Sequence, residues 1–460
     1  MLYKEIPFVR FTLPLVAGIL LRYYTGYILP YYVLIPLIIA LILANSFSDD
    51  RLKSLFYGFV LNLFLLISGY LLYSQKYNIV NNTEAPPGIY TVRVDKKPVP
   101  REKSLKVPSS IMVPSSRGKY RAGAKIMLYF PPESEVHLIR PGTLLELKLS
   151  PLRIQDFDTL DNFDYSRYML HLSYKFYSFA DNYTSTGEYS PGIKQRSASF
   201  QHRLMAKYSS LLNDPQSLAI VSALTLGYKD QLDEEIREKF SGAGISHIMA
   251  VSGLHVGIIM LIISGLLKML QLRSHPVKLL ITILSVWAFA HISGLSPSVT
   301  RASLMFSFVF AGKYAGRHVN PLNSLFASAF ILLVINPFIL FSVSFQLSYS
   351  AVLAILLFYR KMDGLLNFSG LLLSKLWSLV SVTLLAQAGT LPFVLYYFRS
   401  VPMLSVFTNI LAIPLASLII ITGLLLLTIP SSVIISDILA TLLTIETKLL
   451  YSIADWISSI

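Results

Sequence analysis

Long uncharged runs constrain this chain more than any other feature of its sequence. No Asp, Glu, Lys or Arg occurs in residues 23–48, 54–75 or 318–359, which are 26, 22 and 42 residues long. A helix needs roughly 20 apolar residues to cross the hydrocarbon core of a bilayer. The first two runs therefore fit one membrane span each, and the third fits two. Charged residues make up only 14% of the chain, against about 25% in ordinary soluble proteins. The sequence predicts a polytopic α-helical membrane protein.

Two membrane blocks are expected. The first holds three spans near residues 6–22, 27–44 and 54–73, and it does not resemble a cleaved signal peptide because further spans follow it directly. The second begins near residue 240 and predicts about seven to nine spans. Its uncharged runs are 240–267, 279–300, 302–312, 318–359, 376–398 and 400–436.

A polar segment with β character separates these blocks. Alternating or β-rich stretches at 89–94, 104–107, 125–130 and 143–149 are divided by Pro and Gly turns, which predicts a small antiparallel sheet or barrel. Residues 91–160 contain 13 Lys and Arg but 7 Asp and Glu, so this insert is basic.

Amphipathic helices are expected between the insert and the second block. Asp214 followed by Pro215 is typical of a helix start, with Asp214 as N-cap. Asp233, Glu234 and Glu235 place acids at the start of a second short helix.

The charge of the loops predicts the orientation. With the N-terminus in the cytoplasm, three spans leave the insert outside, and loops holding Lys268, Lys313 and Arg360 fall inside. The net charge of +14 also fits contact with anionic lipid or a nucleic acid. The absence of cysteine excludes disulfides and thiolate metal sites.

The densest polar motif covers residues 242–256 at the start of a predicted span. It contains His247, Ser252, Gly253 and His255. Unwound backbone at membrane depth survives only where it is buried in protein or lines a cavity. One interpretation is a glycine-rich helix entry with both histidines bonded to nearby carbonyls. The other is the lining of a conduction path, or a metal or proton site, although no carboxylate follows closely.

Two further polar groups interrupt apolar stretches. Gly294 and Pro297 precede Arg301, which lies between uncharged runs. Such an Arg either reaches the headgroups or faces a water-filled cavity, and a cation along a path would suit a polyanion such as DNA. The second group is Gln346, Ser348 and Gln387, which are expected either to join helices or to line a pore.

The order of these motifs resembles the ComEC competence family. The segment from Gly244 to His247, which runs into Ser252-Gly253-Leu254-His255, is similar to that family's hallmark. The resemblance covers almost all of the chain. It also rests on 223–232, 161–168, Gly294 through Arg301 to Met305, Phe345-Gln346-Leu347-Ser348, and Gln387 with Pro392.

The resemblance implies a DNA-uptake channel in the bacterial cytoplasmic (inner) membrane. The expected parts are three N-terminal spans (1–75), an extracytoplasmic OB-like β domain (76–195), linker helices (196–243) and a channel domain (244–460). Residues expected to line or gate the channel are His247, Ser252, Gly253, His255, Arg301, Gln346, Ser348 and Gln387. Basic residues expected to contact DNA are Arg93, Lys96, Lys97, Lys119, Arg121 and Lys125, and the aromatics available for stacking are Tyr90, Tyr120, Tyr129, Phe130 and Phe157.

Many members of that family add a metallo-β-lactamase-like nuclease domain, but no His-x-His-x-Asp motif occurs in this sequence. We therefore expect conduction without catalysis, cofactor or metal. The implied partners are single-stranded DNA, the lipid bilayer, a separate nuclease, a DNA receptor and a cytoplasmic motor, and a homo-oligomer is compatible. The alternatives are an intramembrane metal-dependent enzyme and a non-DNA transporter or scaffold.

Overall fold

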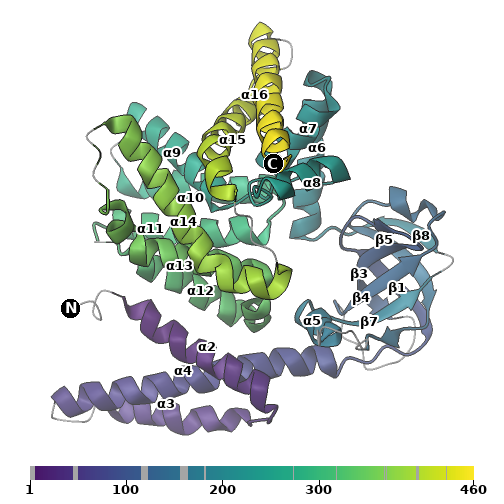
Figure 1. The fold of residues 1–460 in the computed structure, drawn as a ribbon. Coiled ribbons are helices and arrows are strands. Elements are labelled where there is room, and N and C mark those ends of the chain that lie inside the picture. The colour runs from purple at the N-terminus through teal and green to yellow at the C-terminus, as the bar shows by residue number, and fades with distance from the viewer. Residues whose placement is uncertain are drawn as a thin grey trace. The chain divides into compact units, whose positions relative to one another are not determined.

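A computed structural model of the chain describes residues 6–44, 50–114, 123–155, 164–180, 183–272, 274–317, 319–366, 368, 370–399, 404–430 and 433–459 (Figure 1). These residues form two compact units. The first contains residues 7–196 and 330–342, and the second contains residues 1–6, 197–329 and 343–460.

The first unit begins with helices that pack through glycine. The helices are α2 (Pro7–Thr25), α3 (Leu34–Leu43) and α4 (Asp50–Asn81), with the 3₁₀ turn η1 (Tyr31–Val33) before α3. A Cβ added at Gly69 of α4 would lie 2.2 Å from the carbonyl oxygen of Leu15 in α2. The two backbones approach this closely only because glycine carries no side chain. Arg22 of α2 is buried, with its guanidinium 5.4 Å from the ring centre of Tyr77.

A sheet domain follows α4. Its strands are β1 (Gly88–Val94), β2 (Val99–Arg101), β3 (Ser104–Pro114), β4 (Lys125–Phe130), β5 (Thr143–Leu149), β6 (Leu152–Arg153), β7 (Tyr174–Phe179) and β8 (Thr184–Tyr189), with the turn η3 (Glu135–Leu138) and helix α5 (Tyr165–His171) between strands. The order is β6-β7-β4-β3-β1-β5-β8, and β2 pairs with β3. The pairs are antiparallel except β4 with β7, which is parallel.

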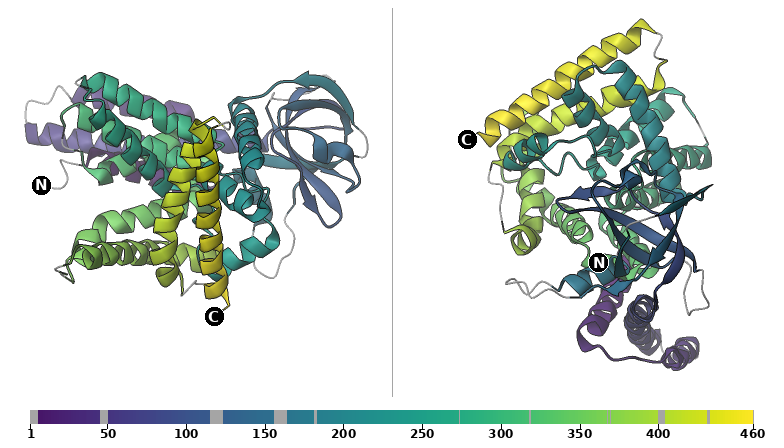
Figure 2. Two further views of the ribbon diagram at one scale, coloured as in Figure 1. Left: turned by 90° about the horizontal axis from the view of Figure 1, so that it is seen from above. Right: turned by 90° about the vertical axis from the view of Figure 1, so that its right-hand side faces the viewer.

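The expected closed barrel is wrong for the described residues, because no pairing joins β6 to β5 or β8. The sheet nevertheless curls strongly (Figure 2). Leu149 ends β5 and Leu152 begins β6, so only Ser150 and Pro151 connect strands that lie far apart in the strand order. The Cα atoms of Leu149 and Leu152 can be at most about 11 Å apart. Since β6 has two residues, it is too short to form a ladder that closes the ring.

The interior of the curled sheet is apolar. Alternate residues of β1, β4 and β5 point into one core, as the period of two requires. Tyr90 and Phe130 belong to this core and are 2% and 1% exposed, so neither is available for base stacking. Tyr129 lies on the opposite face and is half-buried. Tyr120 and Phe157 lie outside the described residues.

An aromatic cluster fixes α5 within the first unit. The ring of His171 stacks on Phe341 at 4.6 Å, and its Nε2 lies 2.9 Å from the hydroxyl of Tyr73. Phe341 ends the turn η5 (Pro337–Phe341). Burial and the nearby Arg167 lower the pKa of His171 from 6.5 to about 4.

The second unit is helical, and neighbouring helices such as α13 and α14, or α15 and α16, lie side by side (Figures 1 and 2). Its elements are α6 (Ile193–Leu211), α7 (Pro215–Val221), the π-helical turn η4 (Ser222–Leu226), α8 (Glu234–Gly242), α9 (Gly253–Met269), α10 (His275–Ile292), α11 (Pro297–Tyr314), α12 (Pro321–Ile335), α13 (Val343–Asp363), α14 (Leu371–Phe398), α15 (Ser405–Thr428) and α16 (Ile434–Ser458). α6 and α12 begin or end in the first unit. The predicted starts are confirmed, since the carboxylates of Asp214 and Asp233 cap α7 and α8.

Five helices among the described residues are long and apolar enough to cross a membrane: α4, α10, α13, α14 and α15. Four shorter apolar helical segments accompany them, at residues 31–43, 215–226, 253–269 and 321–335. The chain is therefore a helical membrane protein with a sheet domain. The number of spans, their orientation and the boundaries of the predicted domains stay predictions.

We expect Gly69→Ala to destabilise the packing of α2 against α4, because the added methyl group would overlap the Leu15 carbonyl. Overpacking of this kind costs about 1–3 kcal/mol. The control is Gly58→Ala in the same helix, where the nearest atom lies 3.9 Å from the added Cβ. Thermal unfolding in detergent should show a lower Tm for the first variant only, and equal values would contradict the packing.

Stability should also depend on pH through His171. The unfolded chain takes up a proton below pH 6.5, whereas the folded chain does so only near pH 4. The free energy of unfolding should therefore fall as the pH decreases from about 6.5 to 4. His171→Gln should flatten this part of the pH profile of Tm, and His202→Gln, at an exposed histidine, should not.

Candidate functional site: the helix breaks of the second unit

Ser252 and His255 together begin α9. The Ser252 hydroxyl accepts a hydrogen bond from the Leu254 amide at 3.3 Å, and His255 Nδ1 accepts one from the Ser252 amide at 3.2 Å. This reciprocal arrangement is a capping box with histidine at the third helical position. Because Nδ1 is an acceptor, the proton of the neutral ring lies on Nε2. His255 is 1% exposed, and its Nε2 has no hydrogen-bond partner among the described residues.

A second break separates α10 from α11. Gly294 adopts a φ of +72°, and the amide of Leu295 donates to the carbonyl of Ala290 at 2.8 Å. This left-handed ending satisfies the last carbonyls of α10. Pro297 then starts α11, because its fixed φ suits the first helical position.

A third break follows the π-helical turn η4. Gly227 ends that turn with a φ of +70°. A Cβ added there would lie 3.1 Å from a methyl carbon of Val251 and 3.2 Å from the carbonyl oxygen of Ser293. Gly227 therefore meets the segments that carry the other two breaks, which sequence spacing does not reveal.

Two polar residues of α6 connect these breaks. The side-chain amide of Gln201 donates to the carbonyl of Leu226, and the same side chain lies against Gly294. The hydroxyl of Ser197 donates to the carbonyl of His291. Both side chains are more than nine-tenths buried. Neither residue was predicted from the sequence, although two polar residues four apart on one face of an amphipathic helix were a usable signal.

Arg301 lies one turn inside α11 and is 4% exposed. Its guanidinium donates to the hydroxyls of Ser298 at 3.1 Å and Ser344 of α13 at 3.3 Å. Its Nε has no partner, and no carboxylate pairs with it among the described residues. The structure thus holds a buried cation with neutral partners only, which is costly in an apolar surrounding.

The helix that carries Arg301, α11, packs against the start of α9. A Cβ added at Gly253 would be 3.7 Å from the Cβ of Ala302, the residue next to Arg301. The structure therefore brings the Ser252–His255 motif and the Arg301 motif to one place. His247 is instead exposed in the turns before α9, and no hydrogen bond joins it to His255 among the described residues.

The remaining predicted residues lie at contacts between neighbouring helices. The side-chain oxygen Oε1 of Gln346 in α13 accepts a hydrogen bond from the Tyr397 hydroxyl of α14 at 2.9 Å. Gln387 of α14 donates to the Ser405 hydroxyl of α15. Ser348 is half-buried on α13. These contacts fit the interhelical interpretation of both glutamines, and their role as channel lining stays a prediction.

The predicted DNA-contacting residues of the sheet domain have varied surroundings. Arg93 pairs with Asp95 at 3.2 Å. Lys125 donates to the carbonyl of Leu172, and burial lowers its pKa. Lys96 and Lys97 are exposed. Lys119 and Arg121 lie outside the described residues. Each assignment to DNA stays a prediction.

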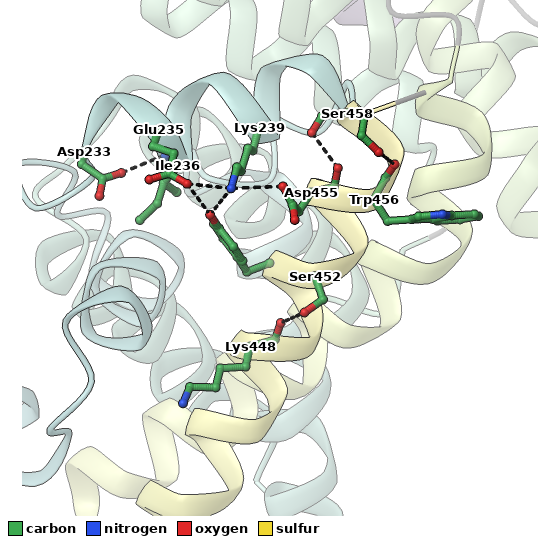
Figure 3. A network of polar contacts seen from close by, with 11 residues as sticks. Asp233, Glu235, Ile236, Lys239, Lys448, Ser452, Asp455, Trp456 and Ser458 are labelled. Carbon is green, nitrogen blue, oxygen red and sulfur yellow. Dashed lines mark hydrogen bonds and ion pairs between the residues drawn. The ribbon is translucent and has the colours of Figure 1, made fainter.

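A polar network joins α8 to α16 (Figure 3). Lys239 of α8 bonds Glu235 at 2.6 Å and Asp455 of α16 at 3.0 Å. The hydroxyl of Tyr451 also bonds Glu235, at 3.0 Å. These contacts raise the pKa of Lys239 and lower that of Glu235. They hold α8 against α16, so the network is structural. No group of three or more His, Asp or Glu side chains that could hold a metal occurs among the described residues.

A family model described as Competence protein matches residues 224–460, which include all three breaks and Arg301. This chain belongs to the competence protein family. The matched segment starts inside η4, so the family region contains most of the site, while Ser197 and Gln201 lie before it.

Two curated relatives of this competence-family chain carry informative names. It is 29% identical over 265 residues to ComE operon protein 3 of Bacillus subtilis strain 168, covering 57% of this chain and 32% of that protein. It is 31% identical over 147 residues to Recombination protein 2 of Haemophilus influenzae, covering 31% of this chain and 19% of that protein. The chain thus spans about a third or less of these relatives. No solved structure matches it significantly.

We expect Ser252→Ala to destabilise the start of α9, because it removes the hydroxyl that accepts the Leu254 amide. Loss of such a cap costs about 1 kcal/mol. Ser274→Ala is the matched control, since Ser274 precedes α10 without a side-chain capping bond. Thermal unfolding should separate the two variants, and equal Tm values would show that the Ser252 hydroxyl does not cap.

Proposed function

We propose that this chain is the membrane channel through which single-stranded DNA enters the cytoplasm during natural transformation. The observation that carries the proposal is the buried guanidinium of Arg301, which has hydroxyl partners but no carboxylate among the described residues. Membership of the competence protein family supports it.

A phosphate would supply the anionic partner that this guanidinium does not have among the described residues. An Arg head offers five N–H donors in a planar fork that matches a phosphate. The hydroxyls of Ser298 and Ser344 occupy part of that capacity, and Nε remains without a partner among the described residues. A phosphate that passes close to Arg301 would gain charge-assisted hydrogen bonds. It would also offset the cost of keeping the cation buried.

The helix breaks give the path its polar lining. In an apolar medium, irregular backbone must be satisfied by protein or by water in a cavity. Here Gln201 satisfies the carbonyl of Leu226 at the break after η4, and Ser197 satisfies the carbonyl of His291 at the break between α10 and α11. The Nε2–H of His255, at the start of the neighbouring helix α9, remains as a donor, and in this proposal it contacts the passing strand. No bond of the DNA is broken in this step.

The setting of the channel follows from the same proposal. The helical block lies in the bacterial inner membrane, and the curled sheet serves as an OB-like extracytoplasmic domain that receives the strand. The chain itself is non-catalytic, so a separate nuclease removes the second strand. A DNA receptor and a cytoplasmic motor complete the route, and more than one copy can assemble.

We expect Arg301→Gln to reduce import of labelled DNA by roughly tenfold to a hundredfold. That range corresponds to one lost charge-assisted hydrogen bond of about 1.5–3 kcal/mol. The loss of import should not be accompanied by a comparable loss of stability, measured as Tm. Removing a buried charge that has no carboxylate partner also removes the cost of its desolvation. Import into cells is measured at matched protein levels.

The control is Arg360→Gln at the exposed end of α13, which should import DNA normally. His255→Ala forms a second arm, compared with Ser252→Ala, because both disturb the cap and only the first removes Nε2. Normal import by Arg301→Gln and His255→Ala together would overturn the assignment of these residues to the path.

A further inference from the structure

The face of the sheet opposite its main apolar core carries a row of side chains that do not belong to that core. The register places Val99 of β2 opposite Lys106 of β3, and Lys106 opposite Tyr129 of β4. Tyr129 in turn lies opposite Phe179 of β7. Directly opposed residues point to the same face, so these four side chains form one lateral row. At about 4.8 Å per strand, the row is about 14 Å long.

Three aromatic rings gather at one end of this row. The ring centres of Tyr129 and Phe179 are 5.8 Å apart, and Tyr177 lies 5.9 Å from Phe179 and 6.2 Å from Tyr129. Tyr129 and Tyr177 pack at their inner edges against a small core that includes Met127. Phe179 is 64% exposed. In this cluster, two rings are held by packing, and the third ring, that of Phe179, is exposed to solvent.

Cations lie at the other end. Val99 shares the face of Lys106, and Arg101 follows it by two residues in the same strand, so Arg101 lies on that face too. Burial, followed by the like charges of Arg101 and Lys96, lowers the pKa of Lys106. One acid, Glu102, lies in the β2–β3 turn. The row therefore combines basic groups with exposed aromatic surface.

This combination fits one ligand chemistry. Unpaired bases stack on aromatic side chains irrespective of sequence, while neighbouring Lys and Arg follow the phosphates. A base pair in a duplex hides its faces, so a duplex cannot use the rings. A peptide or an acidic protein would have no need of an open aromatic ring beside the cations.

We propose that the row Lys106–Tyr129–Phe179, with Tyr177 and Arg101, is a stacking platform for single-stranded nucleic acid. This assignment deepens the proposed function, because it places strand capture on the sheet domain. It differs from the basic residues expected from the sequence, of which Arg93 is already paired with Asp95 and Lys125 already donates to the carbonyl of Leu172. The platform needs neither residue.

The test is binding of a fluorescent oligothymidylate to the full-length protein in nanodiscs. Phe179→Ala should weaken the affinity by roughly 5-fold to 100-fold, the range measured for removal of a stacked base partner. Phe200→Ala, at a Phe of α6 that is 40% exposed, should leave the affinity unchanged. Equal affinities for wild type and Phe179→Ala would overturn the platform.

A charge arm uses the same assay at several salt concentrations. Lys106→Gln should make the log–log salt dependence shallower by about 0.7, the value for one phosphate contact in a single strand. Lys148→Gln is the control, because Lys148 is exposed on β5 of the same sheet and lies outside the row. An unchanged slope in Lys106→Gln would remove Lys106 from the site.

Phe179→Trp tests the occupant directly. Stacking should quench the fluorescence of the new indole when oligothymidylate is added, and a matching duplex should quench it far less. Quenching by brominated lipid in place of the oligonucleotide would overturn the platform and identify a lipid surface as the occupant.

The outcomes separate this inference from the proposed channel. Failure of Phe179→Ala to weaken binding, together with defective import by Arg301→Gln, would remove the platform and leave the channel. Normal import by the Arg301 and His255 variants, together with weak binding by Phe179→Ala, would leave a nucleic-acid-binding sheet on a protein with another membrane role.

Discussion

The second unit depends on how the protein satisfies the backbone where its helices break. Hydrogen bonds lost at a break must be replaced inside an apolar surrounding, where an unsatisfied carbonyl costs several kcal/mol. Gln201 and Ser197 supply two of these bonds from α6, and Ser252 with His255 supplies those at the start of α9. The breaks can therefore be permanent features of the folded protein.

The sequence predicted elements whose signals are local. The stretches 125–130 and 143–149 match β4 and β5, and Asp214 caps α7 as expected. The second short helix also begins where expected, with Asp233 as its cap and Glu234 and Glu235 in its first turn. β7 and β8 were not anticipated, since β7 is read as a strand only once it pairs with β4, 45 or more residues away. The curl without closure was likewise beyond reach, because it depends on the length of β6. Pairing partners are set by long-range contacts that no short pattern contains.

The candidate site shows the same difference between local signals, which the sequence contains, and long-range contacts, which it does not. The polar motifs around Ser252, Gly294 and Arg301 were visible because Gly, Ser and Arg are unusual within apolar runs. Their convergence was not visible, since it requires Gly227 to contact the segments before α9 and after α10. For His255 the structure adds a local duty, because one ring nitrogen caps the helix. The other nitrogen alone is left for a ligand.

The length of α4 has a mechanical consequence. A helix of 32 residues is about 48 Å long, while the hydrocarbon core is about 30 Å thick. The helix is therefore roughly 10–20 Å longer than this core is thick, and its C-terminal end leads into the sheet domain. Lys175 of β7 bonds the carbonyls of Asn81 and Thr83 at that end. The sheet domain is thus attached to a rigid helical extension. A force applied to the sheet would therefore be transmitted to the packed helices α2 and α4.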